Sequence, residues 1–266
     1  MNEKNNVDFG SVAEDYARWN NDFPLHILDK LLQKGIIKYN YYSVDLGSGS
    51  GLITREMTKK GLKVIGVEPS IELIKEAKKI DEMNGLNINY INAKAEDINL
   101  PDEQIEIVTV VRAWHWFERI KVISEIKRIL KPNGYLIIMD SGFIPHKSKL
   151  VQDTLELIRK YTPDRILKPS GSKAETQERR NGFPITWYAD WEEANFKIIE
   201  NSQEKYKVSF SHDGWRGRVR ALSWLSTFEQ EIRNKIDLEL VHLLEKNYPN
   251  EPLIMPHIFS MVVLQK

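Results

Sequence analysis

The chain has 266 residues, and its 38 Lys and Arg balance its 38 Asp and Glu to a formal net charge of zero at pH 7. Hydrophobic residues make up 41% and charged residues 29%, which excludes a wholly disordered or fibrous protein. The lack of cysteine excludes disulfides, thiolate metal sites and a Cys nucleophile. The basic residues form no single tract, so we expect neither nucleic acid nor an anionic membrane as a partner.

The first ten residues are polar and lack the apolar run of a signal peptide, and the sequence has no apolar stretch of 18 residues or more. We therefore expect a cytoplasmic protein. Residues 1–40 predict a helical segment that packs on the core. Asp22 and Pro24 are typical of a helix start, and Leu25, Leu28 and Leu32 share one face of the helix that follows.

Residues 41–141 predict a cofactor-binding α/β core, because short β-branched runs alternate with segments of helical period. The expected strands are Tyr42–Leu46, Lys63–Val67, Asn87–Asn92, Ile105–Val111 and Gly134–Met139. Between the last two, Ile123, Ile126 and Leu130 form a helical stripe that ends at Lys131-Pro132.

Residues 142–266 predict the completion of the sheet together with a substrate-facing helical insertion. We expect a helix over 150–161, an exposed loop or mobile lid over 168–181, two short strands on either side of Asn201, mostly helix over 216–248 and a closing strand over 258–264.

The most informative segment is VDLGSGSG, residues 44–51, which follows an apolar strand and precedes a helix near Leu52. Its glycines allow a tight turn and let backbone N–H groups approach a ligand. A dinucleotide fingerprint needs a third glycine at position 52, which is Leu here, and no Gly-Lys-Ser/Thr ending is present. The spacing therefore disfavours NAD and nucleoside triphosphates.

Glu68 ends the second strand about 20 residues after this loop, where a carboxylate can accept both hydroxyl hydrogens of a ribose. The alternative is a strand-end acid stabilised by the dipole of the following helix.

The chain resembles class I S-adenosylmethionine-dependent methyltransferases of the small-molecule group, the methyltransferase type 11 and trans-aconitate methyltransferase-like enzymes. The resemblance rests on VDLGSGSG, VIGVEPS (64–70), AKAEDINLP (93–101), HWF (115–117) and EIKRILKPNGY (125–135). It implies a Rossmann-like, doubly wound, seven-stranded and mostly parallel sheet with a C-terminal helical insertion or cap. It also implies S-adenosylmethionine as cofactor and methyl transfer to a small-molecule acceptor by in-line displacement.

The resemblance assigns cofactor binding to residues at the ends of four strands and in the opening helix: Tyr16, Arg18, Asp45, Gly47, Ser48, Gly49, Gly51, Glu68, Pro69, Ser70, Ala95, Glu96, Arg112, Ala113, His115 and Trp116. The chain departs from the family pattern at Asn20, where relatives commonly carry arginine, and at Lys94, where they often carry an acid. Trp114 and Phe117 are interpreted mainly as packing residues.

Trp19, Trp215 and Arg216 are the candidates for substrate binding, and the guanidinium makes an acidic acceptor conceivable. The equal alternative for Arg216 is a solvated helix start. His115 and His212 are candidates for a general base if the acceptor must lose a proton, although either can equally be a packing histidine. No metal-ligand spacing occurs among the six histidines, so no metal is expected. A nucleotide-dependent oxidoreductase and a non-catalytic cofactor-binding protein remain the alternative functions.

Overall fold

The computed structural model describes residues 10–20 and 22–266. Its sheet has seven strands in the order β3-β2-β1-β4-β5-β9-β8. The chain forms two compact units. The core unit contains Pro24–Asp140, Ser172–Gln203 and Ser260–Lys266; the second unit contains the described residues up to Phe23, with Ser141–Gly171 and Glu204–Phe259. Each unit is therefore assembled from three segments that are separated in the sequence.

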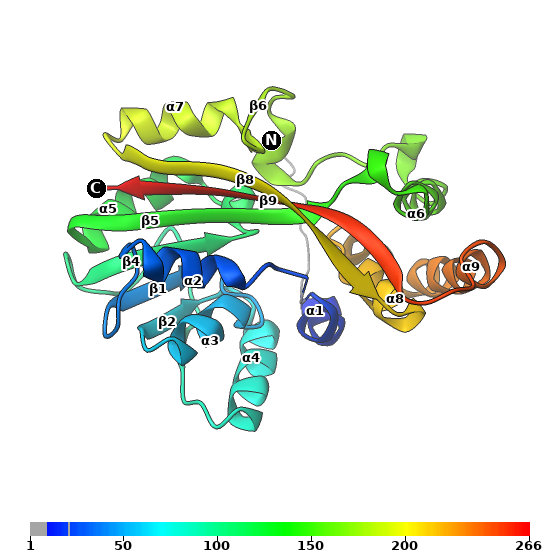
Figure 1. Ribbon diagram of the computed structural model, residues 1–266, viewed down its shortest axis with the longest axis horizontal. Helices are drawn as coiled ribbons and strands as arrows, with labels where there is room; N and C mark the ends of the chain where they lie inside the picture. The colour runs from blue at the N-terminus through cyan, green and yellow to red at the C-terminus, as the bar shows by residue number, and fades with distance from the viewer. Residues whose placement is uncertain (1–9, 21) are drawn as a thin grey trace. The chain divides into compact units, whose positions relative to one another are not determined.

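The strands of the core unit confirm the predicted mostly parallel α/β sheet (Figure 1). Neighbouring strands pair in parallel from β3 to β5. Their bounds are β1 (Tyr42–Leu46), β2 (Lys63–Val67), β3 (Asn89–Ile91), β4 (Ile105–Val111) and β5 (Leu130–Phe143). The sheet is completed by β9 (Leu253–Gln265) and β8 (Lys197–Phe210). Each of β5, β8 and β9 contributes residues to both units.

The helices fall into two sets. The core unit holds α2 (His26–Gln33), α3 (Leu52–Lys59), α4 (Ile71–Met83), η2 (Trp114–Trp116), α5 (Arg119–Ile129) and α7 (Ile185–Glu193), with the β6–β7 hairpin (Arg179–Arg180 and Phe183–Pro184). The second unit holds η1 (Gly10–Val12), α1 (Ala13–Trp19), α6 (Lys149–Arg159), α8 (His212–Arg220) and α9 (Gln230–Asn247). No helix of the described residues is long and apolar enough to cross a membrane.

Side-chain alternation along β1 and β4 gives the sheet two different faces. On one face Val44 and Val110 join a core with the buried stripe of α5 and with Trp187 and Trp191 of α7. On the other face Asp45 of β1 and Thr109 of β4 are hydrogen-bonded to each other, and Asp45 is also bonded to Thr54 of α3.

The second unit has its own core, built from α6, α8, α9 and the adjoining strand segments. A buried charge cluster crosses it: Asp22 Oδ2 accepts hydrogen bonds from Arg218 Nε at 3.0 Å and faces His257 Nε2 at 3.2 Å. The other ring nitrogen of His257 faces the Met255 carbonyl at 3.1 Å. This cluster links the segment before α2 to α8 and β9.

Three elements differ from the sequence expectation. The prediction of two short strands around Asn201 was wrong, because 197–210 form the single strand β8. As the last strand in the sheet order, β8 is half exposed and tolerates polar residues along its length. Strand β5 is longer than expected at both ends. The polar stretch 168–181 is mostly exposed, as predicted, but also contains η5 (Gly171–Ala174) and the first strand of the hairpin.

Candidate cofactor site

The glycine loop runs directly from β1 into α3. The N–H groups of Gly47 and Ser48 both donate to the carbonyl of Val67, at 2.8 and 3.1 Å, and so bind the loop to the end of β2. Gly47, Gly49 and Gly51 all have positive φ angles, of 67°, 55° and 78°. This left-handed backbone is readily adopted only by glycine, and it makes the tight turn possible.

Gly51 is also required by its surroundings. A Cβ atom at this position would lie 2.2 Å from the hydroxyl oxygen of Tyr90. Tyr90 in turn donates to Asp81 Oδ2 at 2.9 Å, and Arg55 Nε donates to Asp81 Oδ1 at 2.6 Å. Arg55 Nη2 also donates to the carbonyl of Ser50 at 3.0 Å, so this buried cluster stabilises the glycine loop.

No sequence motif indicated that Arg55, Asp81 and Tyr90 belong to the site. The two charged residues lie on α3 and α4, where charges are normally read as a solvated face. The only signal was that Asp81 lies on the same helix face as Ala77, which is buried. That signal indicates burial, but it does not indicate which residues pair.

Glu68 lies at the carboxyl end of β2 and is only 6% exposed. Its Oε2 accepts the N–H of Gly49 at 2.9 Å, and its Oε1 accepts the N–H of Ser70 at 2.9 Å. A carboxylate has about four lone-pair sites, so each oxygen retains capacity for a ribose hydroxyl. Burial raises the pKa of Glu68, and the two backbone hydrogen bonds act in the opposite direction.

Asp45 occupies the polar face of β1 beneath the loop. Its two oxygens accept hydrogen bonds from the hydroxyls of Thr54 on α3 and Thr109 on β4, at 2.7 and 2.8 Å. Burial raises the pKa of Asp45 to about 6 despite these bonds. The structure thus shows Asp45 fastening α3 to two strands, while its contact with a cofactor stays a prediction.

Ser48 provides a polar group without a protein partner. Its Oγ is buried and makes no hydrogen bond with the described residues. An unsatisfied buried hydroxyl costs free energy unless a ligand or water completes it. Together with the backbone of Gly49 and the carboxylate of Glu68, it fits a ligand that carries ribose and amino-acid polar groups.

The segment after β3 contains the predicted adenine-edge residues. Ala95 is buried in the core, and Glu96 Oε1 accepts the N–H of Glu118, the residue before α5, at 2.8 Å. Asn92 Nδ2 donates to the carbonyls of Glu68 and Pro69, at 3.1 and 2.8 Å, and so joins the end of β3 to the turn after β2. The structure therefore brings the predicted ribose and adenine residues to one edge of the sheet.

The end of β4 carries the remaining core-unit candidates. Arg112 has a positive φ of 54°, an uncommon conformation for a residue with a side chain, and its N–H donates to the carbonyl of Met139 at 2.9 Å. Ala113 lies against Gly47, where an added Cβ would be 2.5 Å from the alanine methyl. The loop and this strand end are therefore neighbours.

His115 and Trp116 follow in η2, with ring centroids 4.6 Å apart. His115 is buried, and this burial, with the positive charge of Lys173, lowers its pKa well below the usual value. The ring is therefore neutral at physiological pH, and the same burial makes it a weak proton acceptor. Trp114 and Phe117 pack edge to face on the core side, which agrees with their interpretation as packing residues.

The other candidates lie in the second unit. Tyr16, Arg18 and Trp19 are on α1, and Trp19 packs so closely on Gly217 of α8 that a Cβ there would lie 2.2 Å from its ring. Trp215 is only 1% exposed and donates from its indole nitrogen to Thr154 Oγ1 at 3.1 Å. Trp19 and Trp215 therefore have packing roles, and contacts of any of these four side chains with cofactor or substrate stay predictions.

Arg216 and His212 also have protein partners. Arg216 donates to both carboxylate oxygens of Asp237, at 3.1 and 2.5 Å. His212 Nε2 lies 2.8 Å from the carbonyl of Tyr248. Their roles in substrate binding and proton transfer stay predictions. Among the described residues, no group of three or more His, Asp or Glu is arranged to hold a metal ion.

Part of the chain is similar to known methyltransferases. Residues 44–138 match a family described as a methyltransferase domain. A protein named as a methyltransferase in Dictyostelium discoideum is 35% identical over 139 residues, which cover 51% of this chain and 49% of that protein. An uncharacterized methyltransferase of Mycobacterium tuberculosis is 30% identical over 132 residues, 49% of this chain and 50% of that protein. The chain thus spans about half the length of these curated relatives.

A longer match reaches the ubiquinone biosynthesis O-methyltransferase of Actinobacillus pleuropneumoniae, 27% identical over 191 residues, 64% of this chain and 82% of that protein. Among solved structures, a type II methyltransferase from Anaeromyxobacter dehalogenans has a TM-score of 0.60 at 18% identity and covers 91% of this chain and 95% of its own. At that identity the likeness shows a shared fold. Residues 44–138 therefore resemble a methyltransferase domain, and the curated relatives of 30% identity or more match about half of the chain.

Proposed function

We propose that the protein is an S-adenosylmethionine-dependent methyltransferase that methylates a small-molecule acceptor. The observation that carries the proposal is the buried Glu68 carboxylate, which is held by the amides of Gly49 and Ser70 beside the glycine loop. When bound, S-adenosylmethionine supplies an activated methyl group on a sulfonium, with a good leaving group behind it. In-line displacement on such a group needs alignment and exclusion of water more than a dedicated catalyst.

The candidate site residues of the core unit then have distinct roles. Glu68 accepts the ribose hydroxyls, and the Gly49 backbone with the Ser48 hydroxyl holds the adjoining part of the cofactor. His115 and Trp116 line the end of β4, where an aromatic face stabilises positive charge and excludes water. His115 is the narrower part of the proposal, because an acceptor that must lose a proton would have to protonate a ring whose charged form burial disfavours.

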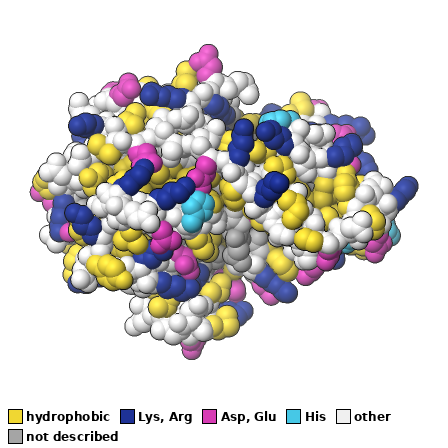
Figure 2. Space-filling model, viewed as in Figure 1, with side chains coloured by type: hydrophobic (Ala, Val, Ile, Leu, Met, Phe, Trp, Pro, Cys, Tyr) yellow, Lys and Arg dark blue, Asp and Glu magenta, His cyan; other side chains and the backbone are white. Residues whose placement is uncertain are grey.

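A small acceptor is supported by the charge distribution. The formal net charge is zero, and basic and acidic side chains are interspersed on the face seen in Figure 2. A nucleic-acid substrate normally requires a positively charged surface. A cytoplasmic location is also part of the proposal, and it accords with the absence of a membrane-spanning helix among the described residues. An acidic acceptor is a narrower proposal, because Arg216 must exchange its hydrogen bonds with Asp237 to bind it.

The two alternative functions differ from this proposal in measurable ways. A nucleotide-dependent oxidoreductase is disfavoured by Leu52 and by the methyltransferase domain match. A non-catalytic protein would bind the cofactor without transferring its methyl group to any acceptor.

Calorimetric titration with S-adenosylhomocysteine and with NAD tests the proposal. We expect micromolar binding of S-adenosylhomocysteine, no binding of NAD, and at least tenfold weaker binding by Glu68→Ala. A preference for NAD, or no binding of S-adenosylhomocysteine, would overturn the proposed function. Binding without turnover on a broad panel of small acceptors would support the non-catalytic alternative.

A further inference from the structure

The segment from Ala95 to Leu100 forms the predicted adenine edge but has no helix or strand of its own. Inside the segment, only two backbone hydrogen bonds are present: Asp97 to the carbonyl of Lys94 at 3.2 Å, and Leu100 to the carbonyl of Ile98 at 2.7 Å. Side chains of α5 supply further hydrogen bonds to its backbone.

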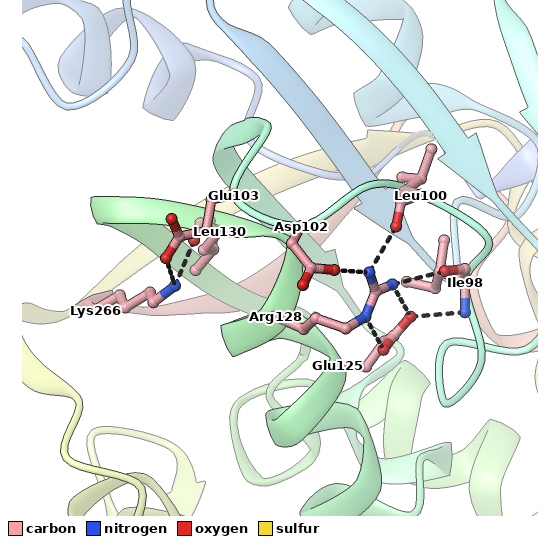
Figure 3. Close-up of polar contacts among 8 residues, drawn as sticks. All are labelled: Ile98, Leu100, Asp102, Glu103, Glu125, Arg128, Leu130 and Lys266. Carbon is pink, nitrogen blue, oxygen red and sulfur yellow. Dashed lines mark hydrogen bonds and ion pairs between the residues drawn. The ribbon is translucent and has the colours of Figure 1, made fainter.

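Arg128 of α5 supplies most of these contacts (Figure 3). Its Nη2 donates to the carbonyl of Ile98 at 2.9 Å, and its Nη1 donates to the carbonyl of Leu100 at 2.7 Å. The same Nη1 donates to Asp102 Oδ1 at 2.6 Å. One guanidinium thus binds three points along five residues of chain, a geometry that the planar fork of arginine suits and a lysine cannot reproduce.

Glu125, one turn earlier on α5, orients this guanidinium. Its Oε2 accepts Arg128 Nε at 2.8 Å and its Oε1 accepts Nη2 at 2.6 Å, a bidentate pair. Glu125 Oε1 also accepts the N–H of Ile98 at 2.9 Å. Both the N–H and the carbonyl of Ile98 are therefore bound by this pair, while the Ile98 side chain is buried in the core.

We propose that Arg128 and Glu125 are positioning residues for the cofactor: they hold the backbone of residues 95–100 in the conformation that receives the adenine ring. This inference rests on the proposed function. Neither residue needs to touch the cofactor, because the Ile98 backbone that they bind follows the predicted contacts Ala95 and Glu96 by two or three positions. Loss of the pair should therefore weaken cofactor binding while the chemical step at the end of β4 continues at saturating cofactor.

The test compares Arg128→Gln and Arg128→Lys with Lys266→Gln. Lys266 is a matched control, since its Nζ binds Glu103, on the β4 side of the same connection, at 3.4 Å and the carbonyl of Leu130, the first residue of β5, at 2.6 Å (Figure 3). Calorimetry measures the Kd for S-adenosylhomocysteine, and hydrogen exchange of the ligand-free protein measures protection of the peptide 94–102. Thermal unfolding checks that each variant is folded.

For Arg128→Gln we expect about a tenfold higher Kd and faster exchange of 94–102, with unchanged exchange of 47–52. Arg128→Lys should give a Kd and an exchange rate between those of Arg128→Gln and the wild type, and Lys266→Gln should match the wild type in both. If Arg128→Gln does not fold, Glu125→Gln takes its place in the same measurements. Wild-type affinity together with wild-type exchange in a folded variant would overturn the inference, whereas failure of the wild-type protein to bind S-adenosylhomocysteine would instead overturn the proposed function.

Discussion

The amide of Gly49 donates a hydrogen bond to Glu68 Oε2 at 2.9 Å, so the acid at the end of β2 holds the glycine loop that follows β1. The loop conformation and the proposed ribose-binding group are therefore parts of one structure. A change at Glu68 should affect the loop even when no cofactor is bound.

The substitution Glu68→Gln tests this coupling. A glutamine amide presents one NH₂ group, which cannot accept the N–H of either Gly49 or Ser70, so one of these bonds is lost. An unsatisfied buried donor costs about 1–3 kcal/mol, and we expect affinity for S-adenosylhomocysteine to fall roughly 10- to 100-fold. Hydrogen exchange of residues 47–52 should also accelerate in the ligand-free protein. The exposed neighbour Glu72→Gln should change neither quantity, and equal effects of the two variants would contradict the coupling.

Asp45 should give the protein a characteristic pH dependence. Its pKa is about 6 in the folded protein against 3.8 as the ordinary value, so the folded state retains a proton that the unfolded chain has lost between about pH 4 and 6. Stability therefore falls as pH rises through this window, by about 3 kcal/mol for a shift of roughly two pH units.

Asp45→Asn removes the ionisable group and should flatten this part of the profile, with the greatest gain in stability relative to wild type above pH 6. Urea unfolding between pH 4 and 8 measures the free energy of unfolding of both proteins. The same slope in both proteins would show that another group is responsible.

Gly51→Ala should destabilise the core unit by about 3 kcal/mol. Its φ of 78° costs an alanine about 1–2 kcal/mol, and the new Cβ would lie 2.2 Å from the Tyr90 hydroxyl. Gly85→Ala is the matched control, because Gly85 also has a positive φ but no atom lies within 4 Å of its added Cβ. Urea unfolding should separate the two variants by 1–2 kcal/mol; equal costs would mean that the contact with Tyr90 is unimportant.

Asp22→Asn should destabilise the second unit. The Arg218 and Asp22 side chains are almost fully buried, and removal of one partner leaves an uncompensated charge at a cost of about 3–5 kcal/mol. Asp153→Asn, which removes a more exposed carboxylate bound by Lys149 and Tyr248, should cost less. Hydrogen exchange of residues 212–220 should report the loss in Asp22→Asn. Unchanged protection there would show that the buried cluster does not stabilise α8.

The core strands were predictable because short β-branched runs alternate with segments of helical period, and β1, β2 and β4 begin and end at the expected residues. The place of Glu68 beside the loop was predictable for a similar reason, since both follow neighbouring parallel strands. Parallel pairing brings the carboxyl ends of such strands to one edge of the sheet.

The supporting contacts were not predictable in this way. Arg55, Asp81 and Tyr90 come from two helices and a strand, and nothing local indicates that they meet. Asp22 and Arg218 are even farther apart in the sequence. A helical pattern shows which face is buried, but the pairing of buried charges is decided by tertiary packing. The single strand β8 was missed for a related reason, because the sheet edge tolerates the polar Asn201-Ser202 pair that local signals mark as a turn.

The central claim, that the loop after β1 and Glu68 hold S-adenosylmethionine, is tested most directly by a crystal structure of the protein with S-adenosylhomocysteine. We expect both ribose hydroxyls within hydrogen-bond distance of the Glu68 carboxylate, and the part of the ligand that adjoins the ribose in contact with Gly47 to Gly49. A ligand bound elsewhere, or a ribose that contacts a different acid while Glu68 keeps only its two amide partners, would contradict it.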